Sequence, residues 1–138
     1  MKRWAILRRS VCIAVMLANP VAAQNFTTQD EVTPILEMTR AHWIAIGAQN
    51  AQDLLYFTHL LSWRCGIAEI RYGLNNAAPE TVLAMEPCHR DSNQPNAIRV
   101  LPFVPYPLNS IEAVTVELVF DDGARMQESF TREQVGLD

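Results

Sequence analysis

The sequence predicts a mainly β fold: a small, disulfide-stapled β-sandwich-like domain with a short N-terminal helix. Three observations lead to this fold class. Residues 111–130 alternate between apolar and polar side chains, as a strand pair with one buried face does. Clusters of turn residues separate several other short apolar segments. Cys65 and Cys88 face each other when the residues between them are folded into a hairpin.

The first 23 residues have the pattern of a cleaved secretory signal. Four basic residues and no acid precede an unbroken apolar run at 11–18, and Val21 and Ala23 supply small side chains before a cut after Ala23. The run is far shorter than the ~20 residues of a membrane-spanning helix. We therefore expect Sec export to the periplasm or the medium, with no membrane anchor after cleavage. The alternative is an amphipathic first helix of the domain.

Cleavage would leave residues 24–138 as a single mainly β domain with an acidic composition. Seven arginines and no lysine remain against fifteen acidic residues, which gives a net charge of −8. A chain of this charge without a basic cluster is a poor partner for nucleic acid or anionic lipid. The apolar content, close to half of the sequence, argues against disorder.

The N-terminal part of the domain is predicted to hold a short helix and a strand. Thr33 is a possible N-cap and Pro34 suits the first helical position, so we expect a helix that continues to about Arg40. Residues 42–50 alternate as a strand does, with apolar side chains on both sides. That pattern predicts a central strand.

Residues 52–63 are ambiguous between strand and helix. Their continuous apolar character favours a buried strand, and periodicity alone does not decide for so short a run. The alternative is an α+β domain in which residues 51–62 are helical. His59 lies within this run, where a histidine is more often a hydrogen-bonded core residue than a ligand.

A hairpin explains the two cysteines that remain after cleavage. Residues 64–74 and 80–88 are predicted strands, and the turn cluster between them places Tyr72 opposite Thr81 and Cys65 opposite Cys88. Directly opposed strand residues have the Cα spacing that a disulfide requires. Such a bond persists in an oxidising compartment and would stabilise the fold by roughly 3 kcal/mol.

The proline-rich segment 92–110 is not predicted to contain a central strand. Its four prolines would remove ladder hydrogen bonds, so we expect an extended path around one end of the domain. Phe103 and Tyr106, which lie between prolines, would form an exposed recognition surface or, as we favour, close the open end of the core.

Residues 111–130 form the clearest hairpin. A three-residue loop at 121–123, with Gly123 in the left-handed bulge position, places one apolar and one polar face on the strand pair. Glu128 is then the odd residue on the apolar face, which suggests an edge position. The expected facing pairs are Leu118 with Met126, Val114 with Phe130, and Thr115 with Ser129.

The function predicted from these features is a small binding or accessory module of the cell envelope without catalytic activity. The partner would be a protein or small molecule of that compartment, and no motif calls for a cofactor or a metal ion. Exposed aromatic side chains would carry recognition. The candidates are Trp43, Tyr56, Trp63, Phe103 and Tyr106.

Two alternatives from other functional classes use the polar residues around Cys88. A small periplasmic hydrolase would use His59 or His89 as its base, oriented by Asp91 or Glu86. His89 and Asp91 share one side if the strand continues. A metal or redox carrier would use Cys65 and Cys88 with these histidines, although the spacings typical of metal sites, such as CxxC, do not occur.

Overall fold

The structure, a computed structural model, describes residues 24–137 and consists mostly of β-strands in two antiparallel sheets. The mainly β class is confirmed. The expected signal segment 1–23 lies outside the described residues. None of the helices within residues 24–137 has the length and apolar character that crossing a lipid bilayer requires.

The first sheet has three strands in the order β1-β2-β5, namely β1 (Ala45–Gln49), β2 (Gln52–Tyr56) and β5 (Phe103–Pro107). The second has four in the order β4-β3-β6-β7, namely β3 (Glu69–Leu74), β4 (Thr81–Val82), β6 (Ala113–Val119) and β7 (Arg125–Thr131). The helical segments are α1 (Gln29–Met38), η1 (Arg40–His42), α2 (Thr58–Leu61), η2 (Arg64–Gly66) and α3 (Arg132–Val135).

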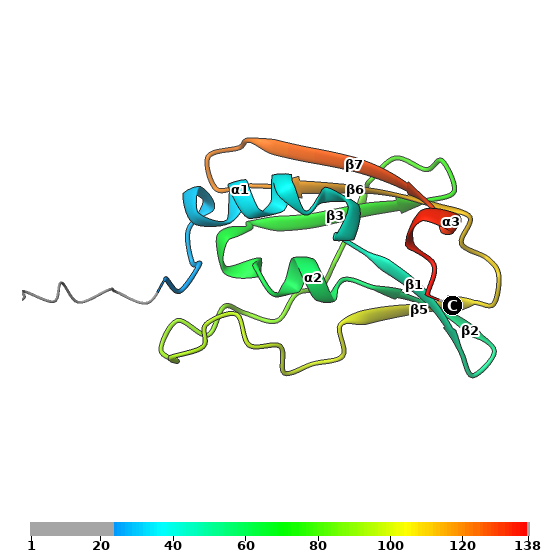
Figure 1. Ribbon diagram of the computed structural model, residues 1–138, viewed down its shortest axis with the longest axis horizontal. Coiled ribbons are helices and arrows are strands. Elements are labelled where there is room, and N and C mark those ends of the chain that lie inside the picture. The colour runs from blue at the N-terminus through cyan, green and yellow to red at the C-terminus, as the bar shows by residue number, and fades with distance from the viewer. Residues whose placement is uncertain (1–23, 138) are drawn as a thin grey trace, which may run out of the picture.

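Both sheets contribute side chains to one core, which Val32 and Leu36 of α1 and Trp43 complete. In Figure 1, β3, β6 and β7 lie along one side of the molecule and β1, β2 and β5 along the other. Two polar contacts join the sheets. The Tyr72 and Tyr106 hydroxyls lie 2.6 Å apart, and the fully buried Asp53 of β2 accepts two hydrogen bonds from Arg132 of α3 at 2.7 and 2.9 Å.

The predicted start of the first helix is wrong. The helix begins at Gln29, and the Glu31 carboxylate accepts hydrogen bonds from the backbone N–H groups of Thr27 and Thr28. This acidic capping arrangement starts the helix five residues before Pro34, so Thr33 is not its N-cap. Pro34 lies within the helix and removes one backbone donor there.

Residues 42–50 do not form a central strand, because β1 is at an edge of its sheet. Trp43 and Ile44 are buried but precede the strand. The outer edge of β1 is covered by the C-terminal segment, where the Leu137 N–H donates to the Ile46 carbonyl at 2.8 Å. The apolar residues of segment 42–50 are therefore covered by the core and by the C-terminal segment. They do not lie between two neighbouring strands.

The ambiguous segment 52–63 contains both kinds of structure. Its first half is the strand β2 and its second half includes the helix α2, so neither single assignment is correct for the whole run. The apolar run is continuous because Leu55 of the strand and Leu60 of the helix both enter the core.

The C-terminal hairpin matches its prediction in register and in turn. Leu118 pairs with Met126, Val114 with Phe130, and Thr115 with Ser129. Gly123 has a φ of 82°, and the Phe120 N–H donates to the Ala124 carbonyl at 3.0 Å. Glu128 lies on the edge strand β7, where Arg40 forms an ion pair with it at 3.6 Å.

The hairpin β3–β4 has the predicted register but is much shorter than expected. Tyr72 faces Thr81, and the Leu83 N–H donates to the Ile70 carbonyl at 2.8 Å. Beyond Leu83 the chain is irregular, and Cys65 belongs to η2 instead of a strand. The expected strand pair up to the cysteines is therefore wrong. In this segment the backbone carbonyls accept hydrogen bonds from the side chain of Arg64, where a β ladder would have supplied backbone N–H groups.

Candidate functional site

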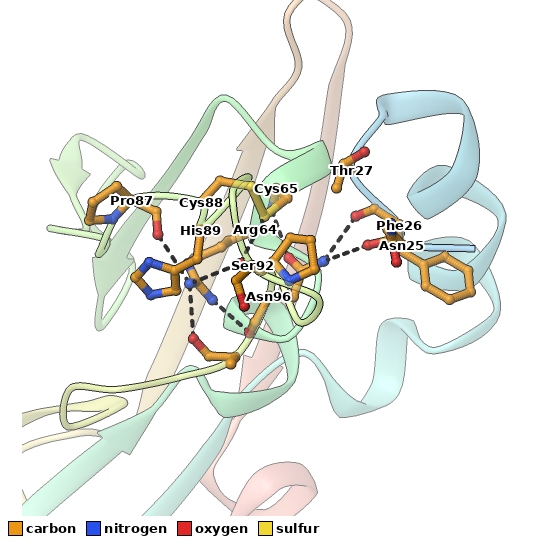
Figure 2. Close-up of a disulfide and its surroundings, with 12 residues drawn as sticks. Asn25, Phe26, Thr27, Arg64, Cys65, Pro87, Cys88, His89, Ser92 and Asn96 are labelled. Atoms are coloured by element: carbon orange, nitrogen blue, oxygen red, sulfur yellow. Dashed lines mark hydrogen bonds between the residues drawn. A yellow bond between two sulfur atoms is a disulfide. The ribbon is translucent and has the colours of Figure 1, made fainter. Parts of the chain in front are cut away.

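Cys65 and Cys88 form a disulfide, as predicted, with a Cα–Cα distance of 5.0 Å. Figure 2 shows the bond beside Arg64 and Asn96. Because both sulfur atoms are bonded to each other, neither is a thiolate that could bind a metal ion or attack a substrate. Within residues 24–137, no three His, Cys, Asp or Glu side chains come together in a group that could hold a metal ion.

Arg64 holds the irregular segment that follows Glu86. Its side chain is almost completely buried and donates hydrogen bonds to backbone carbonyls only. These carbonyls belong to Leu61, Glu86, Pro87, Pro95, Asn96 and Ala97. Figure 2 labels Pro87 and Asn96 of this set beside Arg64. The guanidinium group thus replaces the missing strand ladder and fixes both ends of the loop between Glu86 and Ala97.

His89 pairs with Glu86, not with Asp91. The His89 Nε2 and Glu86 Oε2 atoms are 2.8 Å apart. Burial acts to raise the pKa of Glu86, but hydrogen bonds from the Arg99 N–H and His89, with the positive charge of Arg64, outweigh it and leave this pKa below its ordinary value. The expected His89–Asp91 arrangement is wrong because the chain turns there, with the Ser92 N–H donating to the His89 carbonyl.

The Glu86–His89 pair supplies two members of a hydrolytic triad, an oriented imidazole and its carboxylate. Ser92 lines the same depression, but its Oγ accepts a hydrogen bond from the Gln94 N–H at 3.0 Å. No hydrogen bond joins Ser92 to the His89 ring among the described residues. As it stands, this arrangement lacks a nucleophile in contact with its base.

His59 lies in a different depression, of about 410 Å³, whose lining includes His42 and Tyr56. Its Nε2 atom is 2.8 Å from the Thr39 hydroxyl, which agrees with the expected role of a hydrogen-bonded residue. Burial, with a smaller effect of the His42 charge, lowers the pKa of His59. The two candidate bases therefore do not belong to one site.

The five candidate recognition aromatics do not form one patch. Trp43 is fully buried and donates its indole N–H to the Leu36 carbonyl at 2.9 Å, so it is removed from the set. Tyr56 and Phe103 are half-buried, and their rings pack edge to face with their centroids 5.3 Å apart. Trp63 packs separately against Phe26. Tyr106 is also half-buried, and its hydroxyl is bonded to Tyr72.

A candidate binding site that the sequence did not indicate lies between β4 and the start of β5. We call it the edge groove: a depression of about 360 Å³ lined by residues 82–84, Glu86 and residues 100–104, with the buried Leu61 and Tyr72. Three of the six large hydrophobic residues exposed in the described chain line it. They are Val82, Val100 and Leu101, which are 55%, 54% and 74% exposed.

Beside this groove, the two-residue strand β4 is a sheet edge that no other described segment covers, whereas the other three edges are partly covered. The C-terminal segment covers β1, as described above. In β5, Pro105 and Pro107 occupy the outward-facing positions, since the alternate residues face β2, and proline has no N–H to offer. On β7, Arg40 donates to the Gln127 carbonyl and the Thr131 N–H is bound by Gln134.

The backbone of Val82 faces away from its own sheet. Leu83 and Thr81 direct their hydrogen-bonding groups toward β3, so the groups of the residue between them point outward. The Val82 N–H and C=O make no hydrogen bond to any part of the chain that the structure describes. An open edge of this kind accepts a further strand.

A basic pocket adjoins the edge groove. Residues 87–92 and Arg99 line this depression of about 370 Å³. Of the seven arginines in residues 24–137, five are paired through their side chains within the chain. The other two, Arg90 and Arg99, are exposed, form no such contact with the described residues, and both line this pocket.

Comparison with known proteins adds no relative: no family model matches the chain, and no match is found among curated proteins or solved structures. Fold and site together define a small, disulfide-bonded, mainly β protein with a short uncovered sheet edge beside an apolar groove.

Proposed function

We propose that this chain is a binding module of the cell envelope that holds an extended apolar segment of a partner protein. The segment adds to the sheet as a strand beside β4 and places alternate side chains in the edge groove. The domain serving as scaffold is sandwich-like, with its N-terminal helix α1 packed on the core.

The observation that carries this proposal is the coincidence of free backbone groups and exposed apolar surface. Val82 offers an unpaired N–H and C=O, and its side chain lines the groove with Val100 and Leu101. An extended peptide satisfies both at once, since its backbone bonds the edge and its side chains cover apolar surface. The partial covering of the other three edges supports the use of β4.

A soluble model peptide tests the proposal directly. The probe is a fluorescent octapeptide of alternating valine and serine, amidated at its C-terminus, and the readout is fluorescence anisotropy. We expect binding to the wild-type chain and an affinity about tenfold lower for Leu101→Ser, because a leucine loses its burial on binding. Met38→Ser, which changes an apolar residue that is 83% exposed on α1, should bind as the wild type does.

N-methylated peptides separate strand addition from simple apolar contact. Only alternate N–H groups of an added strand face the sheet edge. Methylating one set of alternate nitrogens should abolish binding, whereas methylating the other set should preserve it. Equal effects of the two sets would reject strand addition.

Export is a separate part of the proposal. A disulfide, with no spanning helix among the described residues, is compatible with an extracellular or periplasmic protein. We propose secretion with cleavage after Ala23. The intact mass of the exported chain should correspond to an N-terminus at Gln24 and to zero free thiols, whereas a retained N-terminal segment would contradict cleavage.

Hydrolysis is the second candidate function, and the Glu86–His89 contact at 2.8 Å is the observation that favours it. In this mechanism His89 would be the base and Glu86 its orienting carboxylate. Hydrolysis of p-nitrophenyl acetate should then fall at least about a hundredfold in His89→Ala. A rate equal to that of the wild type would exclude this role.

A further inference from the structure

We infer that the segment bound in the edge groove is the C-terminal end of the partner protein, and that Arg99, with Arg90 beside it, binds its terminal carboxylate. This inference rests on the proposed function, because it specifies which part of a partner protein would occupy the groove. The structural basis is that the residues that line the basic pocket directly neighbour, in the chain, residues that line the apolar groove.

The linings of the two depressions are consecutive in the chain at two places. Glu86 lines the groove and Pro87 lines the basic pocket, so the boundary falls between neighbouring residues. The same holds on the other side, where Val100 lines the groove and Arg99 the pocket. In the proposed complex, a peptide that leaves the apolar groove at this end comes close to Arg99 and Arg90, which line the neighbouring pocket.

Arg99 is well suited to bind an anion from outside the chain. Its side chain is exposed and makes no ion pair with the described residues, while its backbone N–H is fixed by a hydrogen bond of 2.7 Å to Glu86. A guanidinium group binds a carboxylate through two parallel hydrogen bonds. In a chain whose exported part carries a net charge of −8, the two unpaired arginines lie in one pocket.

The acidic groups near the pocket reduce this attraction without cancelling it. Glu86 is largely buried, and both its oxygens are bonded, one to the Arg99 N–H and the other to His89. Asp91 lines the pocket, and Asp121 lines a neighbouring depression with Arg90. Arg90 thus faces opposing carboxylates, and Arg99 is the principal anchor.

A peptide terminus fits the site better than a fatty acid does, although both present a carboxylate on an apolar chain. The outward N–H and C=O of the exposed Val82 can bond a peptide backbone, which an alkyl chain does not supply. The alternating exposed side chains of an added strand also match a groove with one apolar side.

The test compares three probes on the exported chain: the octapeptide amide, the same peptide with a free C-terminal carboxylate, and decanoate as a competitor. We expect the free acid to bind about tenfold more tightly than the amide at low salt. Arg99→Gln should remove this difference and leave the affinity for the amide unchanged. Arg125→Gln, which alters an exposed arginine of the β6–β7 hairpin, should preserve it.

Each contrary result has a distinct meaning. Equal affinities of acid and amide for the wild type would overturn the carboxylate anchor and leave the proposed function standing. Failure of both peptides to bind would reject the proposed function and the inference together. Displacement of the peptide acid by decanoate at equal concentration would overturn the assignment to a peptide terminus and indicate a lipid ligand.

Discussion

Replacing both cysteines by alanine measures the contribution of the Cys65–Cys88 bond to the free energy of unfolding. The bond joins residues separated by 23 positions. For a loop of this size, the lost entropy of the unfolded chain corresponds to about 3.4 kcal/mol at 25 °C. With an unfolding entropy typical of a domain of this length, the melting temperature should fall by roughly 14 °C.

The folded state should survive this double substitution. Arg64 still binds the carbonyls of Glu86 and Pro87, and β4 still pairs with β3 near the same end of the loop. Urea unfolding, followed by the fluorescence of the buried Trp43, gives the free energy directly. A loss below about 1 kcal/mol would refute the entropy argument, because it would mean that the unfolded chain already keeps the two segments together.

Three further predictions concern the contacts that position the loops and sheets. Arg64→Ala should lower the free energy of unfolding by more than about 3 kcal/mol in urea titrations, because several buried carbonyls lose their donor, and Arg64→Lys should restore little of it. The hydrogen bonds from Arg132 hold the pKa of Asp53 well below its ordinary value. The stability that this pair supplies is therefore present above about pH 4 and is lost as the pH falls toward the folded-state pKa, so the acid dependence of the urea midpoint should be flatter in Asp53→Asn. Gly123→Ala should lower the free energy of unfolding by about 1–2 kcal/mol in thermal unfolding, because alanine is strained at a φ of 82°, and Gly123→Asn should lower it less. An alanine variant as stable as the wild type would contradict the bulged turn.

Sequence reasoning succeeded where neighbouring residues determine the structure. The alternation of residues 111–130 leaves one register that separates apolar from polar faces, and Gly123 selects the turn. The pairing of Tyr72 with Thr81 follows from the position of the intervening turn in the same way. The disulfide is correctly predicted although the hairpin that led to it ends at Leu83, well before the two cysteines.

It failed where distant parts of the chain decide the local structure. The outer side of β1 is covered by residues near the C-terminus, and this cannot be inferred from residues 42–50. Segment 52–63 changes from strand to helix after Phe57, where only the polar pair Thr58 and His59 interrupts its apolar residues. The helix start was misplaced because the proline at position 34 was given more weight than the capping pair Thr28 and Glu31.

The candidate site was the least predictable feature. The edge groove combines residues 82–84 and Glu86 with residues 100–104, and its uncovered backbone edge depends on how β4 pairs. The sequence does single out the residues around Cys88, and of the two carboxylates that it offers as partners of His89, Asp91 and Glu86, the structure pairs Glu86 with it. The exposed residues Val100 and Leu101 gave no signal, because isolated exposed apolar residues are common.

Amide hydrogen exchange at Val82 tests the central claim most directly. In the free chain, the amides of Thr81 and Leu83 face β3 and should exchange slowly, whereas that of Val82 should exchange fast. Addition of the octapeptide should slow exchange at Val82 strongly and leave its two neighbours little changed. Unchanged exchange at Val82 under conditions where the peptide is bound would show that the peptide does not pair with β4, and would contradict the account.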